Sequence, residues 1–404
     1  MNDDPRSSER TAPPVAKNIS IASAIGLGTL MMSTFVAITT EILPVGLLPQ
    51  MSTEFRVDES VIGLVVTLYA VVVAILALPL TAWTARLPRK PLLLVSIGGY
   101  GLSSLIVAIA PTFVLLCVGR AIGGVAHALF FSVVAAYASR LVPRELVGRA
   151  IAIAFAGTSL GYVLGVPLAT SVGAAVGWRA GFAAMAGAAA ILVLLAATLL
   201  PPVVEDHRGS DARIQWQGTG IIAVGLANLL VFLAQYTAYT YIAPILIRAG
   251  LPTSAVGACL LLFGAAGIVG LWSASLFVDR RPRAGALATF AVLAVGLGVA
   301  AVAADSLVVL IVAATLWSAA FGATPSYLMT AAIRTESGSP DSAGALVNGS
   351  SNLGIAGGAA LGSVLLVVGG PVGTLVAGSA LAVATVVLVA VARRGFPAVP
   401  QAER

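Results

Sequence analysis

Three ionisable side chains stand inside apolar stretches of this 404-residue sequence, and proton exchange is the chemistry that they suggest. Glu41, within TEILPVGLLP, is the one acid of 16 that we place inside an apolar span. A charged side chain at the bilayer centre costs about 2.5–3.5 kcal/mol on insertion scales. Such residues usually face a bundle interior and mark a proton or substrate path. The alternative is that Glu41 lies near the membrane surface and reaches the headgroups.

Arg120 and His127 are two helical turns apart, so they share one helix face, which Phe131 continues. Arg120 is the one base of 22 that falls inside a span. We expect it about 10 Å deep, at 1.5 Å per residue, and thus near the depth of Glu41. Two roles stay open for Arg120: pairing with the Glu41 side chain, or hydrogen bonding to main-chain oxygens of a neighbouring helix. We take Glu41, Arg120 and His127 as candidate proton-coupling residues, without ranking Glu41 and His127 as the carrier.

The elements that position these residues are predicted to be transmembrane helices. The chain is 59% hydrophobic and 9% charged, whereas soluble proteins carry about 25% charged residues. This composition excludes a large soluble enzyme. Apolar runs long enough to cross about 30 Å of hydrocarbon recur along the chain. We predict an all-α integral membrane protein with twelve transmembrane helices in two six-helix pseudo-symmetric bundles, at 19–50, 58–84, 90–110, 112–140, 145–170, 178–200, 215–246, 253–278, 284–303, 306–333, 341–367 and 371–392.

The polar stretch PPVVEDHRGSDAR separates six spans from six. Eighteen of the 22 bases fall on the side of the two chain ends and three on the other side. The positive-inside rule therefore predicts that both termini are cytoplasmic, and the net charge of +6 needs no nucleic-acid partner. The expected divisions are a disordered cytoplasmic arm at 1–18, an N-terminal bundle at 19–200, a cytoplasmic linker at 201–214, a C-terminal bundle at 215–393 and a cytoplasmic tail at 394–404.

Polar and aromatic residues in two later spans are candidate substrate contacts. Gln235, Tyr236 and Tyr239 cluster on one helix face; the alternative is an aromatic belt at the membrane surface. Asn348 and Asn352 are one turn apart, and their alternative is hydrogen bonding between helices. Together with Thr40 and Phe131 they predict a mostly neutral pocket. Such a pocket suits neutral hydrogen-bonding solutes such as sugars, or amphiphilic drugs, better than strong anions.

The sequence shows no pattern for an enzyme, a metal or a bound cofactor. Cys117 and Cys259 both fall inside spans, so a disulfide or metal site is not expected. Neither an HExxH pattern nor a nucleotide-binding glycine loop is present. We expect a small-molecule substrate, protons and the lipid bilayer as partners, with a proton gradient as the energy source and a monomeric chain.

Glycines shape the fifth span, GTSLGYVLGVPLATSVG, where Gly157, Gly161, Gly165 and Pro167 form a smooth strip. Close helix packing is the simpler explanation. The segment nevertheless resembles the antiporter motif of major facilitator superfamily exporters. RAIGG, from Arg120, resembles that superfamily's fourth-span motif, whose arginine is linked to proton transfer. The loop pair Asp279–Arg280 is similar to part of its loop motif.

TEILPVGLLP, RAIGGVAHALFFS, GYVLGVPLATSVG and QYTAYTYIAP together resemble the bacterial sugar-efflux and chloramphenicol or multidrug-efflux branch. The resemblance implies proton-driven export by alternating access across a bacterial inner membrane. Two other functions remain open. One is uptake by symport or facilitated diffusion, which the same fold serves. The other is a sensor or scaffold that does not transport.

Overall fold

The chain folds into membrane-length helices. The structure is a computed structural model that describes residues 20–84, 87–143, 146–201, 218–335 and 340–397. Eleven helices in these ranges are long and apolar enough to cross a membrane. The last of them contains Gly370 at φ 62° and ψ −161°, followed by Pro371, so it consists of two spans. The predicted all-helical class with twelve spans is confirmed for the described chain.

The first six spans, here called the N half, begin at Ser20, whose side chain caps the first helix by accepting from the Ser23 amide. The fifth span is interrupted by a π-helical turn, η2 (Gly161–Gly165). The helices are α1 (Ile21–Phe55), α2 (Glu59–Thr84), α3 (Arg89–Ile109), α4 (Phe113–Arg140), α5 (Val147–Leu160), α6 (Val166–Val176) and α7 (Trp178–Leu199).

The last six spans, here called the C half, start with a helix that breaks near its end. Thr240 and Tyr241 separate α8 from the short α9. A 3-10 turn, η4 (Thr253–Ala255), precedes the next span. The helices are α8 (Thr219–Tyr239), α9 (Ile242–Arg248), α10 (Val256–Phe277), α11 (Pro282–Val302), α12 (Leu307–Arg334) and α13 (Pro340–Val391).

Three spans differ most from the expected limits. α1 runs to Phe55 rather than to 50, and Pro44 and Pro49 lie inside it. Membrane helices tolerate proline because neighbouring helices satisfy the freed backbone groups. The fifth span continues to Val176 rather than to 170, and Gly177 at φ 99° ends it. The span expected at 215–246 is divided into α8 and α9.

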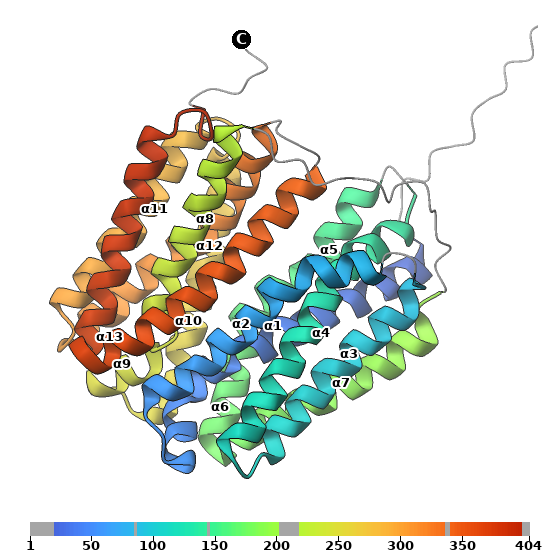
Figure 1. Cartoon of the computed structure of the whole chain (residues 1–404), viewed down its shortest axis with the longest axis horizontal. Coiled ribbons are helices and arrows are strands. Elements are labelled where there is room, and N and C mark those ends of the chain that lie inside the picture. Colours follow the sequence, from blue (N-terminus) through green and yellow to red (C-terminus); the bar gives the residue numbers. More distant parts are fainter. Residues whose placement is uncertain (1–19, 85–86, 144–145, 202–217, 336–339, 398–404) are drawn as a thin grey trace, which may run out of the picture.

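The two halves form two groups of helices that meet at one end of the molecule (Figure 1). Across the division α2 packs on α13, α6 packs on α10 and α1 contacts α9. We call the end that carries the α1–α2 connection and α9 the distal end; the described chain begins and ends at the opposite one. The expected arm at 1–18, most of the linker at 201–214 and the tail beyond 397 lie outside the described residues. The bundle limits 19–200 and 215–393 stay a prediction.

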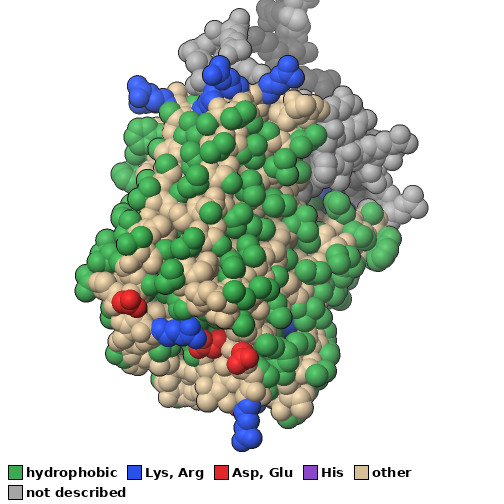
Figure 2. All heavy atoms as spheres, turned by 60° about the vertical axis from the view of Figure 1, so that its left-hand side comes forward, with side chains coloured by type: hydrophobic (Ala, Val, Ile, Leu, Met, Phe, Trp, Pro, Cys, Tyr) green, Lys and Arg blue, Asp and Glu red, His purple; other side chains and the backbone are tan. Residues whose placement is uncertain are grey.

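The surface matches a membrane environment. Large apolar side chains such as Ile75, Val95 and Val302 are exposed along the spans. Figure 2 shows hydrophobic side chains over the middle of one face, and Lys and Arg gathered at the end that bears the chain termini. Acidic side chains appear at the distal end, with a few basic ones. This is a multi-pass membrane protein.

Candidate functional site

Glu41 lies in the middle of α1 with only 4% of its surface exposed. Its carboxylate Oε2 is 3.8 Å from Nδ1 of His127 on α4. Glu41 therefore does not reach solvent in this conformation, and it faces another span of the same half. The alternative that it lies at the membrane surface does not fit this burial.

Arg120 is fully buried on α4 and holds α1 through main-chain oxygens. Its Nη1 donates to the Thr40 carbonyl and its Nη2 to the Glu41 carbonyl, both at 2.8 Å. In an α-helix the amide of residue 44 would occupy the carbonyl of residue 40, but Pro44 has no N–H to donate. Arg120 thus satisfies an oxygen that Pro44 leaves free. The sequence left two roles open for Arg120, and the structure shows the second one, hydrogen bonding to main-chain oxygens of a neighbouring helix.

Tyr69 on α2 joins this group and was not singled out from the sequence. Its hydroxyl lies 3.1 Å from Nδ1 of His127, and its ring lies 4.3 Å from the guanidinium carbon of Arg120. A buried guanidinium over an aromatic face gains a cation–π attraction. A tyrosine inside an apolar run usually indicates a packed side chain. The only sequence feature that could have marked Tyr69 as functional is a hydroxyl group in the middle of a span. We call Glu41, Tyr69, Arg120 and His127 the buried charge cluster.

An aromatic wall closes one side of the cluster. Phe131 stacks on His127 with ring centroids 4.5 Å apart, and Tyr100 meets the same imidazole edge-on at 6.2 Å. The shared face of α4 expected from the sequence is present. The hydroxyl of Thr40 is buried and has no hydrogen-bond partner among the described residues, which leaves one polar atom beside Glu41 free for a ligand or water.

The glycine strip of the fifth span packs directly on α1. A methyl group at Gly157 would lie 2.0 Å from the Met31 carbonyl oxygen, and one at Gly165 would lie 1.8 Å from Oγ1 of Thr39. A methyl group at Gly161 would lie 2.9 Å from Cβ of Ile38, and the buried Pro167 is at the start of α6. The close packing that the sequence offered as the simpler explanation is therefore present, and its partner is the helix that carries Glu41.

The candidates on α8 are buried at the division between the halves. Gln235 and Tyr236 are 3% and 1% exposed, and Tyr239 is half-buried. Oε1 of Gln235 has no partner in the described chain. Tyr236 approaches the hydroxyl of Tyr162 in the N half at 3.3 Å. Burial of this kind differs from a membrane-surface belt.

The two asparagines of α13 differ. Asn352 is 4% exposed, whereas Asn348 is exposed. Nδ2 of Asn352 donates to the Asn348 carbonyl at 3.0 Å, and Oδ1 of Asn352 has no partner among the residues described. The hydrogen bonds between helices come instead from Asn228 on α8, which donates to Ser350 and Ser351 on α13 at 2.7 and 2.9 Å.

Asp279 of the loop pair Asp279–Arg280 makes an ion pair outside that loop. Oδ1 of Asp279 lies 3.0 Å from Nη2 of Arg334, at the end of α12. The Asp279 side chain is 81% exposed, so this contact contributes little to stability. Arg334 is 55 positions from Asp279 in the sequence, so the loop sequence alone could not predict this contact.

The halves are in close contact near the distal end. The ring of Tyr241, which follows α8, is fully buried, and a methyl group at Gly63 on α2 would lie 2.2 Å from its hydroxyl oxygen. Nearby, Nη2 of Arg248 on α9 lies 3.4 Å from Oε2 of Glu59 on α2. We call these four residues the distal seam. It joins the N half to the C half at that end, beside a hollow of about 440 Å³ that Glu59 and Arg248 help to line.

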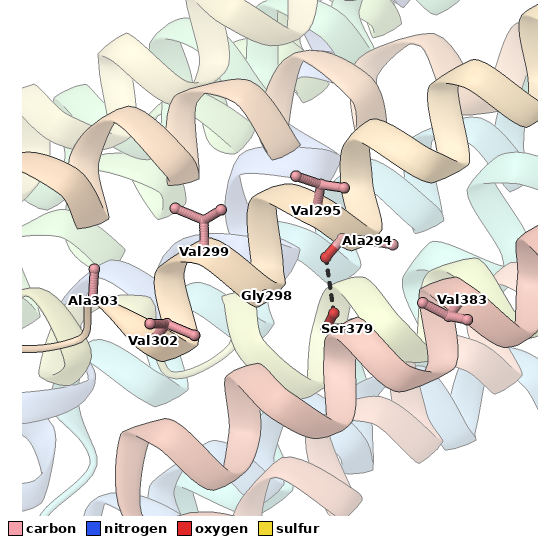
Figure 3. A pocket seen from close by; sticks show the side chains of 8 residues that line it. All are labelled: Ala294, Val295, Gly298, Val299, Val302, Ala303, Ser379 and Val383. Atoms are coloured by element: carbon pink, nitrogen blue, oxygen red, sulfur yellow. Dashed lines mark hydrogen bonds between the residues drawn. The ribbon is translucent and has the colours of Figure 1, made fainter.

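A groove of about 470 Å³ lies elsewhere, between α11 and the second span of α13 (Figure 3). Its lining is Ala, Val and Gly apart from Ser379, whose hydroxyl donates to the Ala294 carbonyl at 2.8 Å. All its lining residues belong to the C half, and several of the valines are exposed. It belongs to the apolar outer surface. No cluster of metal-ligating side chains is found within the described ranges.

Comparisons with known proteins agree with this architecture. The chain is 34% identical over 357 residues to a chloramphenicol efflux pump of Mycobacterium tuberculosis H37Rv, which covers 85% of this chain and 86% of the relative. The same identity and coverage hold for the pump of strain CDC 1551 / Oshkosh.

Solved structures with the same fold are more distant in sequence. A bacterial homolog of the human lysosomal transporter Spinster, in an inward-facing and occupied conformation, superposes with a TM-score of 0.71 at 15% identity, over 91% of this chain and 94% of that one. The human organic anion transporter MFSD10 gives 0.64 at 18% identity, over 91% and 98%. A model of the Major Facilitator Superfamily matches residues 30–340. The chain belongs to the major facilitator superfamily and is a transporter rather than an enzyme.

Proposed function

We propose that this transporter exports small neutral or amphiphilic molecules in exchange for protons, by alternating access. The observation that carries the proposal is the buried Glu41, whose carboxylate contacts His127 while Arg120 holds the adjoining main chain. A buried carboxylate that gains and loses a proton changes charge inside the protein, and this biases a two-state equilibrium between conformations. Relatives that are named chloramphenicol efflux pumps support export as the direction.

The candidate substrate contacts support a neutral ligand. Gln235 and Asn352 each bury an amide oxygen that has no partner among the described residues. Leaving such an atom unsatisfied costs about 1–3 kcal/mol, so a ligand hydroxyl or amide N–H that reaches it gains affinity. The aromatic rings of Phe131, Tyr236 and Tyr239 supply apolar surface. We include Thr40 and Asn348 as further contacts, and we propose Gly157, Gly161, Gly165, Pro167, Asp279 and Arg280 as gating residues.

The distribution of bases supports the orientation in the membrane. Lys and Arg gather at the end of the termini, as Figure 2 shows, and positive charge favours the cytoplasmic side. We therefore propose that the distal end faces outward, in a bacterial inner membrane. The closed distal seam then corresponds to a conformation that is shut toward the outside.

Glu41→Gln tests the proposal, because glutamine keeps the shape of the side chain and removes its proton exchange. In proteoliposomes with chloramphenicol as the probe, we expect wild type to accumulate it under a pH gradient. Glu41→Gln should reduce this accumulation to the level of empty liposomes, while gradient-free exchange persists. Flux direction in vesicles of the two orientations separates export from symport.

Glu54→Gln is the matched control. Glu54 lies on the same helix, but it is surface-exposed and bonded to Trp178 and Arg179 within the N half. It should keep gradient-driven accumulation. If Glu41→Gln accumulated chloramphenicol as wild type does, Glu41 would not be the proton site. If wild type moved neither chloramphenicol nor sugars under any gradient, a non-transporting sensor would fit better.

A further inference from the structure

Two tyrosine hydroxyls from opposite halves meet in the interior. Tyr162 on η2 belongs to the N half and Tyr236 on α8 to the C half, and their hydroxyl oxygens are 3.3 Å apart. Tyr236 is buried and Tyr162 is half-buried. Either hydroxyl can donate, so the two form one hydrogen bond across the division between the halves.

The backbone of η2, which carries Tyr162, is packed between α1 on one side and α10 on the other. It lies in a π-helical turn, a rare element that often occurs at functional sites. On one side, a methyl group at Gly161 would lie 2.9 Å from Cβ of Ile38, three residues before Glu41. On the other, a methyl group at Gly264 of α10 would lie 2.7 Å from Cα of Val163. A shift of α1 near Glu41 must therefore move η2.

Tyr236 is held just as firmly in the C half. Its ring stacks on Phe232 with centroids 6.3 Å apart and meets Phe321 edge-on at 6.3 Å. A methyl group at Gly358 on α13 would lie 3.0 Å from Cβ of Tyr236. The backbone of Tyr162 and the ring of Tyr236 are thus each anchored in their own half, so separation of the halves on this side breaks the bond.

Resting on the proposed function, we propose that Tyr162 and Tyr236 are positioning residues. They couple the protonation state of Glu41 to substrate binding in the C half. When the hydroxyls separate, each needs a new partner, because an unsatisfied buried hydroxyl is unfavourable. A hydroxyl or amide group of a neutral substrate supplies that partner. Substrate binding thereby stabilises the separated arrangement, and η2 passes the change to the helix of Glu41.

Tyr162→Phe tests the inference, since it removes the hydroxyl and keeps the ring. The readout is the ratio of gradient-driven chloramphenicol accumulation to gradient-free chloramphenicol exchange in proteoliposomes. We expect Tyr162→Phe to lower this ratio at least about fivefold, which corresponds to a change of about 1 kcal/mol. Tyr236→Phe should lower it similarly. The double variant should be no worse than either single one, because all three lack the same bond.

Tyr137→Phe is the matched control, because the Tyr137 hydroxyl donates to the Pro201 carbonyl within the N half. It should leave the ratio unchanged. If wild type accumulates chloramphenicol and Tyr162→Phe keeps the wild-type ratio, the coupling role is overturned and the proposed function stands. Additive effects in the double variant, or an equal loss in Tyr137→Phe, overturn it too. If wild type shows gradient-driven accumulation of neither chloramphenicol nor sugars, both proposals fall.

Discussion

The two halves share a six-span plan but bury different polar side chains. The N half buries an acid, a guanidinium and an imidazole in Glu41, Arg120 and His127. In the C half the buried polar side chains of the described residues are neutral, amides such as Asn228 and Gln235 together with hydroxyls. The same architecture therefore places ionisable groups in one half and hydrogen-bonding groups in the other.

This difference follows from what each kind of group requires. A buried charge is very unfavourable unless it is paired and hydrogen-bonded. The N half provides the Thr40 carbonyl that Pro44 leaves free, the face of Tyr69 and the imidazole of His127. A buried amide needs only hydrogen-bond partners, and Asn228 finds them on α13. The contrast supports a division of labour in which proton exchange belongs to the N half and most of the polar ligand contacts belong to the C half.

Proton exchange in one half can drive ligand transport in the other only if the halves move against each other. Gly63→Ala should have the largest effect on that movement. The added methyl group would overlap the buried Tyr241 ring across the distal seam. Overpacking of this kind costs about 1–3 kcal/mol, so the population closed at the distal end should fall about tenfold. Distances between spin labels at the distal ends of α2 and α9, measured by pulsed electron resonance, report this population.

Gly285→Ala is the control for that variant. A methyl group there would lie 2.4 Å from the hydroxyl of Tyr327, but α11 and α12 both belong to the C half. It should lower the thermal unfolding midpoint without changing the distal distances. Unchanged distances in Gly63→Ala would contradict the view that the distal seam closes the transporter.

Arg120→Ala should act on stability rather than on movement, with a loss of about 2 kcal/mol in the free energy of unfolding, because the buried Thr40 carbonyl is left without a donor and the buried Glu41 carbonyl loses one of its donors. Arg120→Lys should be intermediate, since an ammonium group cannot span both oxygens as the planar fork does. Denaturant titration in mixed micelles measures the loss.

Pro44→Ala sharpens this prediction. Alanine restores an amide that can donate to the Thr40 carbonyl within the helix, so Arg120→Ala should be less harmful in the Pro44→Ala background by about 1–3 kcal/mol. Strict additivity of the two substitutions would show that Arg120 does not serve the oxygen left free by Pro44.

The sequence predicted the spans and the members of the cluster better than their contacts. Charge patterns and apolar runs are local properties, so twelve spans and the isolation of Glu41 and Arg120 were readable. Contacts between spans are not local. The partner of Arg120 was left open because it depends on which helix face meets α4. Tyr69 was missed because a tyrosine in an apolar run is typical of packing, and the glycine strip did not identify α1 as its partner.

Asn228→Ala should give the smallest of these effects and marks the neutral side of the comparison. It removes hydrogen bonds to Ser350, Ser351 and the Val347 carbonyl, but the two NH₂ hydrogens of Asn228 are shared among these three acceptors. Ser350 keeps its own hydrogen bond to the Leu346 carbonyl at 2.7 Å. Hydrogen bonds between membrane helices are typically worth about 0.6 kcal/mol, so unfolding should lose about that amount, well below the loss in Arg120→Ala. A loss in Asn228→Ala as large as that in Arg120→Ala would mean that buried neutral groups stabilise the fold as much as buried charged groups do. The two halves would then differ in the chemistry of their buried groups but not in how much those groups contribute to stability.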